Sequence, residues 1–336
     1  MNRKCWRLGV VPLWWLAAAV TPVALATEAA ATTAPKAALD CFNHGDYVCA
    51  QQILADAQKR QPQNAEIAYY LGRSAHRRHD WKTAVEQLQH AVDLQPRQAE
   101  YHFRLGLALS RFIDTVGVLS KPGIATRIRD ALVQAIALNP DFIDARDALL
   151  KYDLAAPGFL GGSLEGAREQ AAEIAKRSAG DGHIALAEIA DDQKQAAVAV
   201  DEYKAAIAAG PAAVAHDARI ALSQLYQRQR RYDDSIELMQ QALRLDAQDR
   251  QAQYELGNTA LLCGCRSELG IAAVKDYLAQ PGRDDDDDPA PAQAHLLLGS
   301  LYRQQQKRAE ARVVYSTALQ LDAQLDEARQ ALRTLD

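Results

Sequence analysis

The sequence predicts an all-α fold in which one pair of helices is repeated along most of the chain. Three observations support this prediction. The composition is rich in Ala, Leu and Gln but only 6% aromatic, which is typical of helices packed on helices. Glycine and proline are sparse, at 18 and 12 of 336 residues, so each one marks a boundary. Small residues and prolines recur at a fixed spacing, since Gly72 and Gly106 stand 34 residues apart, as do Pro62 and Pro96.

Residues 1–26 have the pattern of a secretory signal peptide. Three basic residues among the first seven precede a short apolar run (8–20), and an A-x-A cleavage motif follows at 24–26. We expect cleavage at this motif, a short linker over 27–34, and a periplasmic or secreted protein. Its remaining sequence, 35–336, has no apolar run long enough to span a membrane. The alternative, an uncleaved anchor helix, is disfavoured because the apolar run is short.

The charge balance argues against a nucleic-acid-binding protein. Cleavage of the signal would remove three of the 38 basic residues and none of the 43 acidic ones, which leaves eight more acidic than basic residues. A mildly acidic chain without a basic tail lacks the electrostatic attraction to phosphates on which nucleic-acid binding depends.

Two short patterns repeat in phase along the chain. The tetrapeptides YYLG, FRLG, YELG and LLLG open four units, and their glycines are Gly72, Gly106, Gly257 and Gly299. A second helix then carries a small residue, a large apolar or aromatic residue and an alanine, as in the segment 311–318. This arrangement resembles the tetratricopeptide repeat (TPR), a 34-residue helix–turn–helix with the pattern W-x2-L-G-x2-Y, A-x3-F, A, P.

The resemblance covers nearly the whole chain after the signal. It implies a right-handed superhelical solenoid of about eight repeats, with a final capping helix that solvates the open end of the stack. The expected repeats span 31–64, 65–98, 99–142, 143–179, 180–213, 216–249, 250–291 and 292–325, with the cap over 326–336.

Small residues are expected to mark where the two helices of a repeat cross. In the second repeat these are Gly72 in the first helix and Ala84 in the second, where a hydrogen or a methyl group lets the two backbones approach. A turn is expected between them, near His79-Asp80. One repeat cannot bury its own apolar face, so stability must come from stacking on its neighbours.

Three interruptions of the period predict irregular loops. The third repeat is 10 residues longer than the 34-residue norm, with the extra residues near 114–123, and the fourth contains a glycine-rich stretch over 154–166. These loops come from adjacent repeats and are therefore placed to touch and form a local lid or contact surface. The five aspartates at 284–288 lack the spacing and the glycine of a calcium loop, so we interpret them as a solvated linker.

The stretch 158–163 has two interpretations. A glycine-rich loop before a helix can cradle an anion, but the lysine of a nucleotide-binding loop and its preceding strand are missing here. We therefore interpret Ser163 as the N-cap of the next helix, with Gly161 and Gly162 providing unusual backbone dihedral angles.

Four cysteines remain after the signal. Cys41 and Cys49 lie about four residues on either side of a turn between two antiparallel helices, and we expect them to form a disulfide that pins the exposed first repeat. Cys263 and Cys265 lie at a turn of the seventh repeat. A redox role, a metal-binding role and a bond between the two remain open beside a structural role, because one C-x-C without nearby ligands is a weak signal.

The chain contains no recognisable catalytic, metal-binding or cofactor-binding motif. It has no G-x-S-x-G, no H-E-x-x-H, no Walker loop and no dinucleotide fingerprint. His76 and His79 stand three residues apart without a carboxylate at suitable spacing, so we interpret them as part of a solvated basic patch. The sequence therefore predicts a non-catalytic protein with no cofactor and no metal.

The resemblance implies that the first helices of the repeats line a concave groove that binds a protein partner. Outward positions of these helices place aromatic residues beside guanidinium groups, and both residue types are enriched where proteins bind each other. The expected groove residues are Tyr69, Tyr70, Arg73, Arg77, Phe103, Arg104, Arg111, Tyr254 and Asn258.

The predicted function is an interaction scaffold or adaptor that binds an extended or helical segment of a protein or peptide. Because arginine pairs well with carboxylates, we expect acidic residues of that segment to meet the four groove arginines. Two alternatives come from other features. One is a small-ligand-binding or enzymatic protein that uses the loops 114–123 and 154–166, and the other is a subunit of an envelope complex that binds by its convex face.

Overall fold

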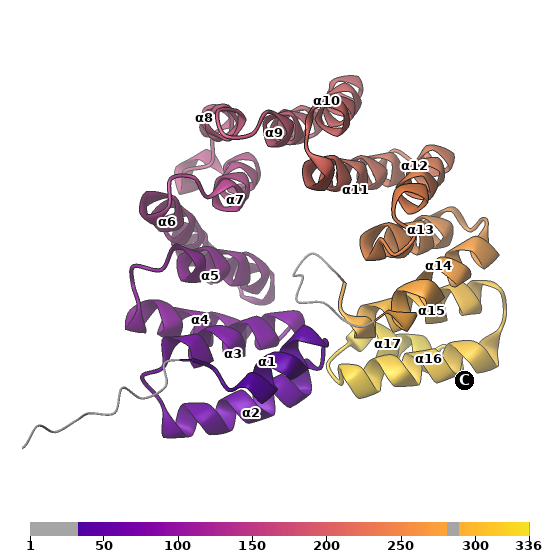
Figure 1. Ribbon diagram of the computed structural model, residues 1–336, viewed down its shortest axis with the longest axis horizontal. Coiled ribbons are helices and arrows are strands. Elements are labelled where there is room, and N and C mark those ends of the chain that lie inside the picture. Colours follow the sequence, from indigo (N-terminus) through magenta and orange to yellow (C-terminus); the bar gives the residue numbers. More distant parts are fainter. Residues whose placement is uncertain (1–32, 281–288, 336) are drawn as a thin grey trace, which may run out of the picture. The chain divides into compact units, whose positions relative to one another are not determined.

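The computed structural model describes residues 33–280 and 289–335. These residues form seventeen α-helices and three short 3₁₀ helices, and no strand occurs among them (Figure 1). Within the same ranges, no helix combines the length and the apolar character that crossing a membrane requires. The expected signal peptide and the five aspartates at 284–288 lie outside the described residues.

The helices follow one another as eight pairs and a final helix. The first members of the pairs are α1 (Lys36–Asn43), α3 (Ala65–Arg77), α5 (Ala99–Phe112), α7 (Ile143–Ala155), α9 (Ala179–Asp192), α11 (Ala212–Arg228), α13 (Arg250–Cys263) and α15 (Pro291–Gln304). The second members are α2 (Tyr47–Arg60), α4 (Trp81–Leu94), α6 (Lys121–Leu138), α8 (Leu164–Ala175), α10 (Ala196–Ala209), α12 (Tyr232–Leu245), α14 (Ser267–Ala279) and α16 (Arg308–Leu321). The final helix is α17 (Asp326–Arg333).

The observed pairs follow the predicted fold class, with one shift in a repeat boundary. The expected repeat 216–249 begins too late, because α11 already starts at Ala212. Pro211 stands at the N-cap of this helix and has the fixed backbone angle that suits a helix start. Helix α11 is therefore one turn longer at its N-terminus than the 34-residue pattern indicates.

Five of the helix pairs share one turn geometry, which we call the regular turn. Its middle residue has a left-handed backbone, and the next residue donates its N–H to a carbonyl five residues earlier, as Asp80 does to Ala75 O at 2.9 Å. Such a bond satisfies a carbonyl that the helix end leaves open. The left-handed residues are Gly45, His79, Lys194, Arg230 and Gln306.

A glycine allows the two helices of a repeat to approach closely. A Cβ atom at Gly72 would lie 2.5 Å from Leu88 Cγ and 3.1 Å from the backbone nitrogen of Leu88 on α4. Ala84 is fully buried, but the residue opposite Gly72 is Leu88, one turn further along α4. The same relation recurs between Gly299 and Tyr315, so the expected small-residue crossing exists and is shifted by one turn.

The odd-numbered helices form the inner layer of the stack. They pack against one another from α7 to α15, and α3 packs against α5, whereas no two successive even-numbered helices of the described unit pack to a comparable extent. In a curved stack of helix pairs, the layer whose members lie closer together is on the inside of the curve. We call the face formed by the odd-numbered helices the inner surface and the face formed by the even-numbered helices the outer surface (Figure 1).

The two long loops of adjacent repeats both pack on α6. The 3₁₀ helices Ile113–Thr115 and Val118–Ser120 lie between α5 and α6, the 3₁₀ helix Gly158–Leu160 lies between α7 and α8, and all three contact α6. Their tips carry apolar side chains in solvent, with Leu119 98% and Phe159 83% exposed. The loops therefore share a supporting helix and present apolar residues outward.

The glycine-rich stretch is explained by local structure. Ser163 caps α8, because its Oγ accepts the N–H of Gly166 at 2.9 Å, which confirms the N-cap interpretation. Gly161 has φ 91°, in the left-handed region. Gly162 is required for a different reason, since a Cβ there would lie 1.9 Å from Ala156 O.

The first and the last repeats are in contact. Ala290 packs with the apolar residues of α1 and α2, and a Cβ at Gly45 would lie 3.3 Å from Pro291 Cγ. The imidazole of His79 lies 2.9 Å from Gln293 Nε2 and 4.0 Å from the carboxylate of Asp322. Helix α17 covers the apolar residues that α15 and α16 would otherwise leave open at the end of the stack.

The first repeat contains the expected pair of cysteines. The sulfur atoms of Cys41 and Cys49 lie 2.08 Å apart, and their Cα atoms 5.9 Å apart, so the two residues are at bonding distance. We expect the purified protein to show no alkylation at Cys41 in denaturant without reductant, and full alkylation after reduction. Peptide mass spectrometry measures both states, and labelling of Cys41 before reduction would contradict the bond.

Candidate partner-binding surface

An aromatic–arginine cluster occupies the inner surface of the first three repeats. It consists of Phe42, Tyr69, Tyr70, Arg73 and Tyr101. The rings of Tyr69 and Tyr101 stack at 4.9 Å, and Tyr70 meets Tyr69 edge-on at 5.1 Å and Phe42 edge-on at 5.6 Å. The Arg73 guanidinium carbon lies 4.8 Å from the Phe42 ring centre, which is within range of a cation–π contact.

Three of the expected contact residues are buried rather than exposed. Tyr69, Arg73 and Phe103 are only 8%, 8% and 6% exposed. The helical period of α3 and α5 places them on the outward side of their own helices, but aromatic side chains from neighbouring repeats cover them. Tyr69 donates to Glu100 Oε1 at 3.1 Å, and its burial raises the pKa of its phenol. These three residues support the surface, and they are not its outermost layer.

The other expected arginines lie at the edge of this cluster. Arg77 Nε donates to Tyr47 Oη at 2.9 Å, and Arg104 Nε donates to Glu100 Oε1 at 2.5 Å. Both are half-buried, whereas Arg111 in the last turn of α5 is exposed. Together with half-buried Tyr70, these side chains are the part of the predicted set that a partner can reach.

Tyr254 and Asn258 both lie on α13, and Asn258 belongs to a separate polar network between α11 and α13. Asn258 Nδ2 donates to Gln227 Oε1 at 3.2 Å, and Gln227 Nε2 donates to Thr259 Oγ1 at 2.9 Å. Ser235 Oγ lies 2.9 Å from the same Thr259 hydroxyl. Tyr254 is half-buried and meets Tyr277 edge-on at 5.9 Å. The predicted set is thus divided between two regions of the inner surface.

A pocket of about 430 Å³ opens on the inner surface between these two regions. Residues of α7, α9, α10 and α11 line it, and we call it the inner pocket. Its lining residues are Lys151, Leu154, Ala155, Glu188, Asp191, Asp192, Lys194, Tyr203, Ala221, Gln224 and Arg228.

Charged groups of three repeats pair across the inner pocket. Lys151 Nζ lies 2.7 Å from Asp147 and 3.1 Å from Glu188, and Arg228 Nη2 lies 2.8 Å from Asp191. Burial raises the pKa of the Glu188 carboxyl, and the neighbouring Asp147 carboxylate adds to this shift. The pocket is therefore lined by charged groups of both signs, several of which pair with one another.

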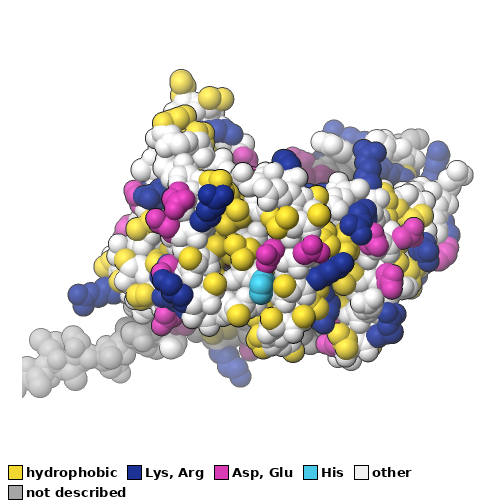
Figure 2. All heavy atoms as spheres, turned by 90° about the horizontal axis from the view of Figure 1, so that it is seen from above, with side chains coloured by type: hydrophobic (Ala, Val, Ile, Leu, Met, Phe, Trp, Pro, Cys, Tyr) yellow, Lys and Arg dark blue, Asp and Glu magenta, His cyan; other side chains and the backbone are white. Residues whose placement is uncertain are grey.

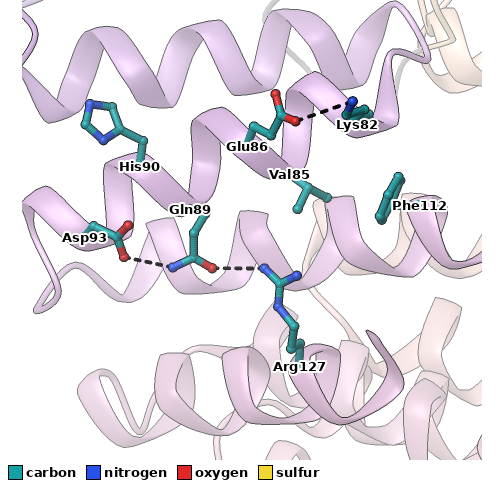
Figure 3. A pocket seen from close by; sticks show the side chains of 8 residues that line it. All are labelled: Lys82, Val85, Glu86, Gln89, His90, Asp93, Phe112 and Arg127. Carbon is teal, nitrogen blue, oxygen red and sulfur yellow. Dashed lines mark hydrogen bonds and ion pairs between the residues drawn. The ribbon is translucent and has the colours of Figure 1, made fainter. Parts of the chain in front are cut away.

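A second pocket, of about 420 Å³, lies on the outer surface along α4 (Figure 3). Arg127 of α6 donates to Gln89 Oε1 at 3.1 Å, and Gln89 in turn donates to Asp93 at 2.9 Å. Lys82 pairs with Glu86 at 4.0 Å, and Phe112 lies against the apolar end of the pocket. We call this the outer pocket. It is open and mixed in character, and the sequence did not indicate it.

The face in Figure 2 shows basic, acidic and hydrophobic side chains interspersed, with no broad region of one charge. No group of three or more His, Cys, Asp or Glu side chains in the described ranges has the geometry to hold a metal ion. His76 and His79 instead pack on Trp81, edge-on at 5.1 Å and stacked at 5.0 Å. The arrangement supports binding of a chain segment by aromatic and charged side chains.

Several residues of this surface were missed by the sequence analysis. Phe42 and Tyr101 complete the aromatic–arginine cluster, and Lys151 and Arg228 complete the inner pocket. Tyr101 stands in the repeat pattern two residues before Phe103, so a search for aromatics on the first helices could have found it. Phe42 lies on α1, also a first helix, so the same search could have found it, but its contact with Arg73 depends on how the two repeats stack.

The comparisons with known proteins agree on one kind of repeat. A family model described as a tetratricopeptide repeat matches residues 36–88, 71–111 and 220–263, and a second model of the same description matches 292–325. No curated protein sequence matches the chain.

Solved structures give matches of low sequence identity. TTC0263, a thermophilic TPR protein of Thermus thermophilus, is 19% identical over 56% of this chain and 95% of its own, with a TM-score of 0.45. A tetratricopeptide repeat protein from Parabacteroides merdae is 12% identical over 89% of this chain and 96% of its own, with a TM-score of 0.44. YrrB, described as a TPR protein with an unusual peptide-binding site, is 14% identical over 74% of this chain and 100% of its own, with a TM-score of 0.36.

Proposed function

The chain belongs to the tetratricopeptide repeat family, and from this premise we propose that it is a non-catalytic adaptor that binds an extended or helical protein segment along its inner surface. The observation that carries this proposal is the position of the aromatic–arginine cluster and the inner pocket on the same layer of helices. A segment lying along that layer meets aromatic rings and arginines first and a polar pocket next.

The chemistry of the first region favours an acidic partner segment. Arg111 is exposed, and Arg104 and Arg77 keep part of their guanidinium surface accessible. Arginine binds carboxylates through paired N–H donors, and aromatic residues beside it provide apolar contact area. The partner of this proposal therefore carries acidic residues spaced along an otherwise apolar or polar segment.

Export from the cytoplasm is part of the same proposal. Its support is the signal-like pattern over 1–26 and the presence of two cysteine pairs at bonding distance, Cys41–Cys49 and Cys263–Cys265. Disulfides persist in oxidising compartments and are rare in the cytosol. N-terminal sequencing of the protein from the periplasm or the medium should begin at Thr27, and a Met1 terminus on a cytoplasmic protein would contradict export.

Site-specific photocrosslinking tests which surface binds. A photoreactive residue at Tyr70 or Tyr254 probes the inner surface, and one at Val133, which is 39% exposed on α6, probes the outer surface. We expect the inner positions to crosslink a defined partner in the native cell envelope and the outer position to give none. Crosslinks confined to Val133 would favour binding by the convex face, where the outer pocket lies.

Charge reversal tests the chemistry of the inner surface. We expect Arg104→Glu with Arg111→Glu to lower the crosslinked yield at Tyr70 roughly tenfold, because both changes repel an acidic segment. The matched control is Arg60→Glu with Arg127→Glu, which makes the same change in net charge on even-numbered helices. An unchanged yield, with unchanged circular dichroism of the variant, would reject the acidic partner.

A second candidate function uses the loops 114–123 and 154–166. The observation in its favour is the apolar tip of each loop, where Val118, Leu119 and Phe159 are 80%, 98% and 83% exposed. Shortening both loops distinguishes the two candidates. Retained crosslinking at Tyr70 in the shortened protein would support the inner surface, and loss of crosslinking there would favour the loops.

A further inference from the structure

The turn between α13 and α14 differs from the regular turn, although three residues separate the two helices in both. In the second repeat, the left-handed residue His79 is followed two residues later by the start of α4 at Trp81. In the seventh repeat, the left-handed Gly264 is the first residue after α13, and α14 starts three residues later, at Ser267. The last residue of α13 and the first two residues of this turn form the sequence Cys263-Gly264-Cys265.

The residue before α14 has an unfavourable backbone conformation. Arg266 has φ 50° immediately before α14, whereas the residues that precede α4 and α16, Asp80 and Lys307, have φ −82° and −81°. A left-handed conformation is costly for a residue with a Cβ atom. No side chain caps the start of α14, so local hydrogen bonds do not offset this cost.

A disulfide closes this turn. The sulfur atoms of Cys263 and Cys265 are bonded, with one residue between them in the sequence, while the Cys41–Cys49 bond has a sequence separation of 8. A disulfide stabilises a fold by restricting the unfolded chain, and this effect is smallest for the shortest loop. The bond between Cys263 and Cys265 therefore contributes little to stability while it holds an irregular turn.

The turn with the two cysteines lies at the surface, although Cys265 also packs against the apolar residues of α12 and α13. Gly264 is exposed, and both cysteines are half-buried at the surface. A Cβ at Gly264 would have Gln304 Nε2, at 3.6 Å, as its only neighbour within 4 Å, so nothing bulky covers the turn. The N–H of Cys265 donates to Cys263 Sγ at 3.0 Å, and a donor at this sulfur favours its departure as a thiolate.

We propose that Cys263 and Cys265 form a redox-active site that exchanges its disulfide with the dithiol of another protein. A thiolate of that protein attacks Cys265 Sγ, the Cys263–Cys265 bond breaks, and Cys263 leaves as a thiolate that takes a proton from water. The second thiolate of the partner then attacks the partner's sulfur in the mixed disulfide and releases Cys265, which is also protonated. Two electrons and two protons pass to this chain, and the partner keeps a new disulfide.

A redox titration tests the site in the whole protein. The protein is equilibrated with buffers of reduced and oxidised glutathione and, separately, with reduced thioredoxin, and peptide mass spectrometry after alkylation reads each cysteine pair. We expect Cys263–Cys265 to be at least about tenfold more reduced than Cys41–Cys49 in the same buffer. The Cys41–Cys49 pair is the internal reference. Equal resistance of both pairs to both reductants would overturn the proposal.

Two variants at Arg266 test whether the turn controls the site. Arg266→Gly and Arg266→Ala remove the same charge, but only glycine adopts the left-handed conformation without cost. We expect the glycine variant to favour the disulfide about fivefold over the alanine variant, because the closed turn no longer has to hold a residue with a Cβ atom in the left-handed region. Identical equilibria for the two variants would show that turn strain does not set the redox balance and would reject the role of the turn.

Discussion

Replacing Gly72 with alanine is expected to lower the free energy of unfolding by about 2 kcal/mol, because it overpacks the crossing of α3 and α4. The new Cβ would lie 2.5 Å from Leu88 Cγ and 3.1 Å from Leu88 N. The side chain of Leu88 is fully surrounded, at 1% exposure, and the backbone nitrogen cannot move without shifting α4. The two helices must therefore separate, and each neighbouring repeat loses contacts with the pair.

The matched control is Gly123→Ala in the first turn of α6. A Cβ at Gly123 would have no atom within 4 Å, so the change brings only the higher helix propensity of alanine, about 0.5 to 1 kcal/mol in favour of folding. Urea denaturation followed by circular dichroism measures both variants. A Gly72→Ala protein as stable as the control would mean that α3 and α4 do not cross at this residue.

The second large effect is a pH dependence that His216 introduces. Its Nε2 lies 3.1 Å from Asp249 and its Nδ1 lies 3.2 Å from Asp217. The hydrogen bonds to Asp217 and then to Asp249 raise the pKa of His216 from 6.5 to about 10. Asp249 is 7% exposed and caps α13, so the imidazolium links α11 to the start of the next repeat.

The sign of the effect follows from the raised pKa. Between about pH 6.5 and pH 10 the folded protein holds a proton on His216 that the unfolded chain has lost. The stabilisation by this residue is therefore complete below pH 6.5, falls as the pH rises, and is lost above about pH 10. Because hydrogen bonds between charged groups contribute about 1.5 to 3 kcal/mol, we expect roughly 2 kcal/mol at pH 6.

The unfolding free energies of the unmodified protein and of His216→Gln, measured at pH 6 and pH 10.5, isolate this contribution, since the other titrating groups are common to both proteins. The expected difference in unfolding free energy is about 2 kcal/mol at pH 6 and near zero at pH 10.5. His102→Gln is the control, because His102 is half-buried and its Nε2 lies 2.9 Å from a backbone carbonyl, that of Pro96. A pH-independent difference for His216→Gln would reject the ionic link.

The sequence predicted the helix pairs because their signals are local. The glycine at Gly72, the turn at His79 and the alanine at Ala84 each act within one repeat, and the structure places all three in one helix–turn–helix unit. The N-cap at Ser163 is local in the same way. These features depend on residues close together in the chain, so their spacing in the sequence is sufficient to predict them.

The exposure of the inner surface could not be predicted in the same way. Arg73 is outward on α3, yet Phe42 of α1 lies over its guanidinium, and this contact depends on how two repeats stack. Lys151 and Glu188 pair across two repeats for the same reason. The irregular turn at Arg266 was visible in principle, since Gly257 and Gly270 stand 13 residues apart where Gly72 and Ala84 stand 12 apart.

The contact between the first and last repeats changes how the molecule should open. In a linear array each terminal unit has one neighbour, so thermal opening starts at the ends and moves inward. Here Ala290 packs with the first repeat, which gives both terminal units a second neighbour, and Gln293 meets His79 of the second repeat. Amide hydrogen exchange in α1 and α16 should therefore slow to the rate of the central helices, because neither terminal repeat is a free end from which unfolding can start.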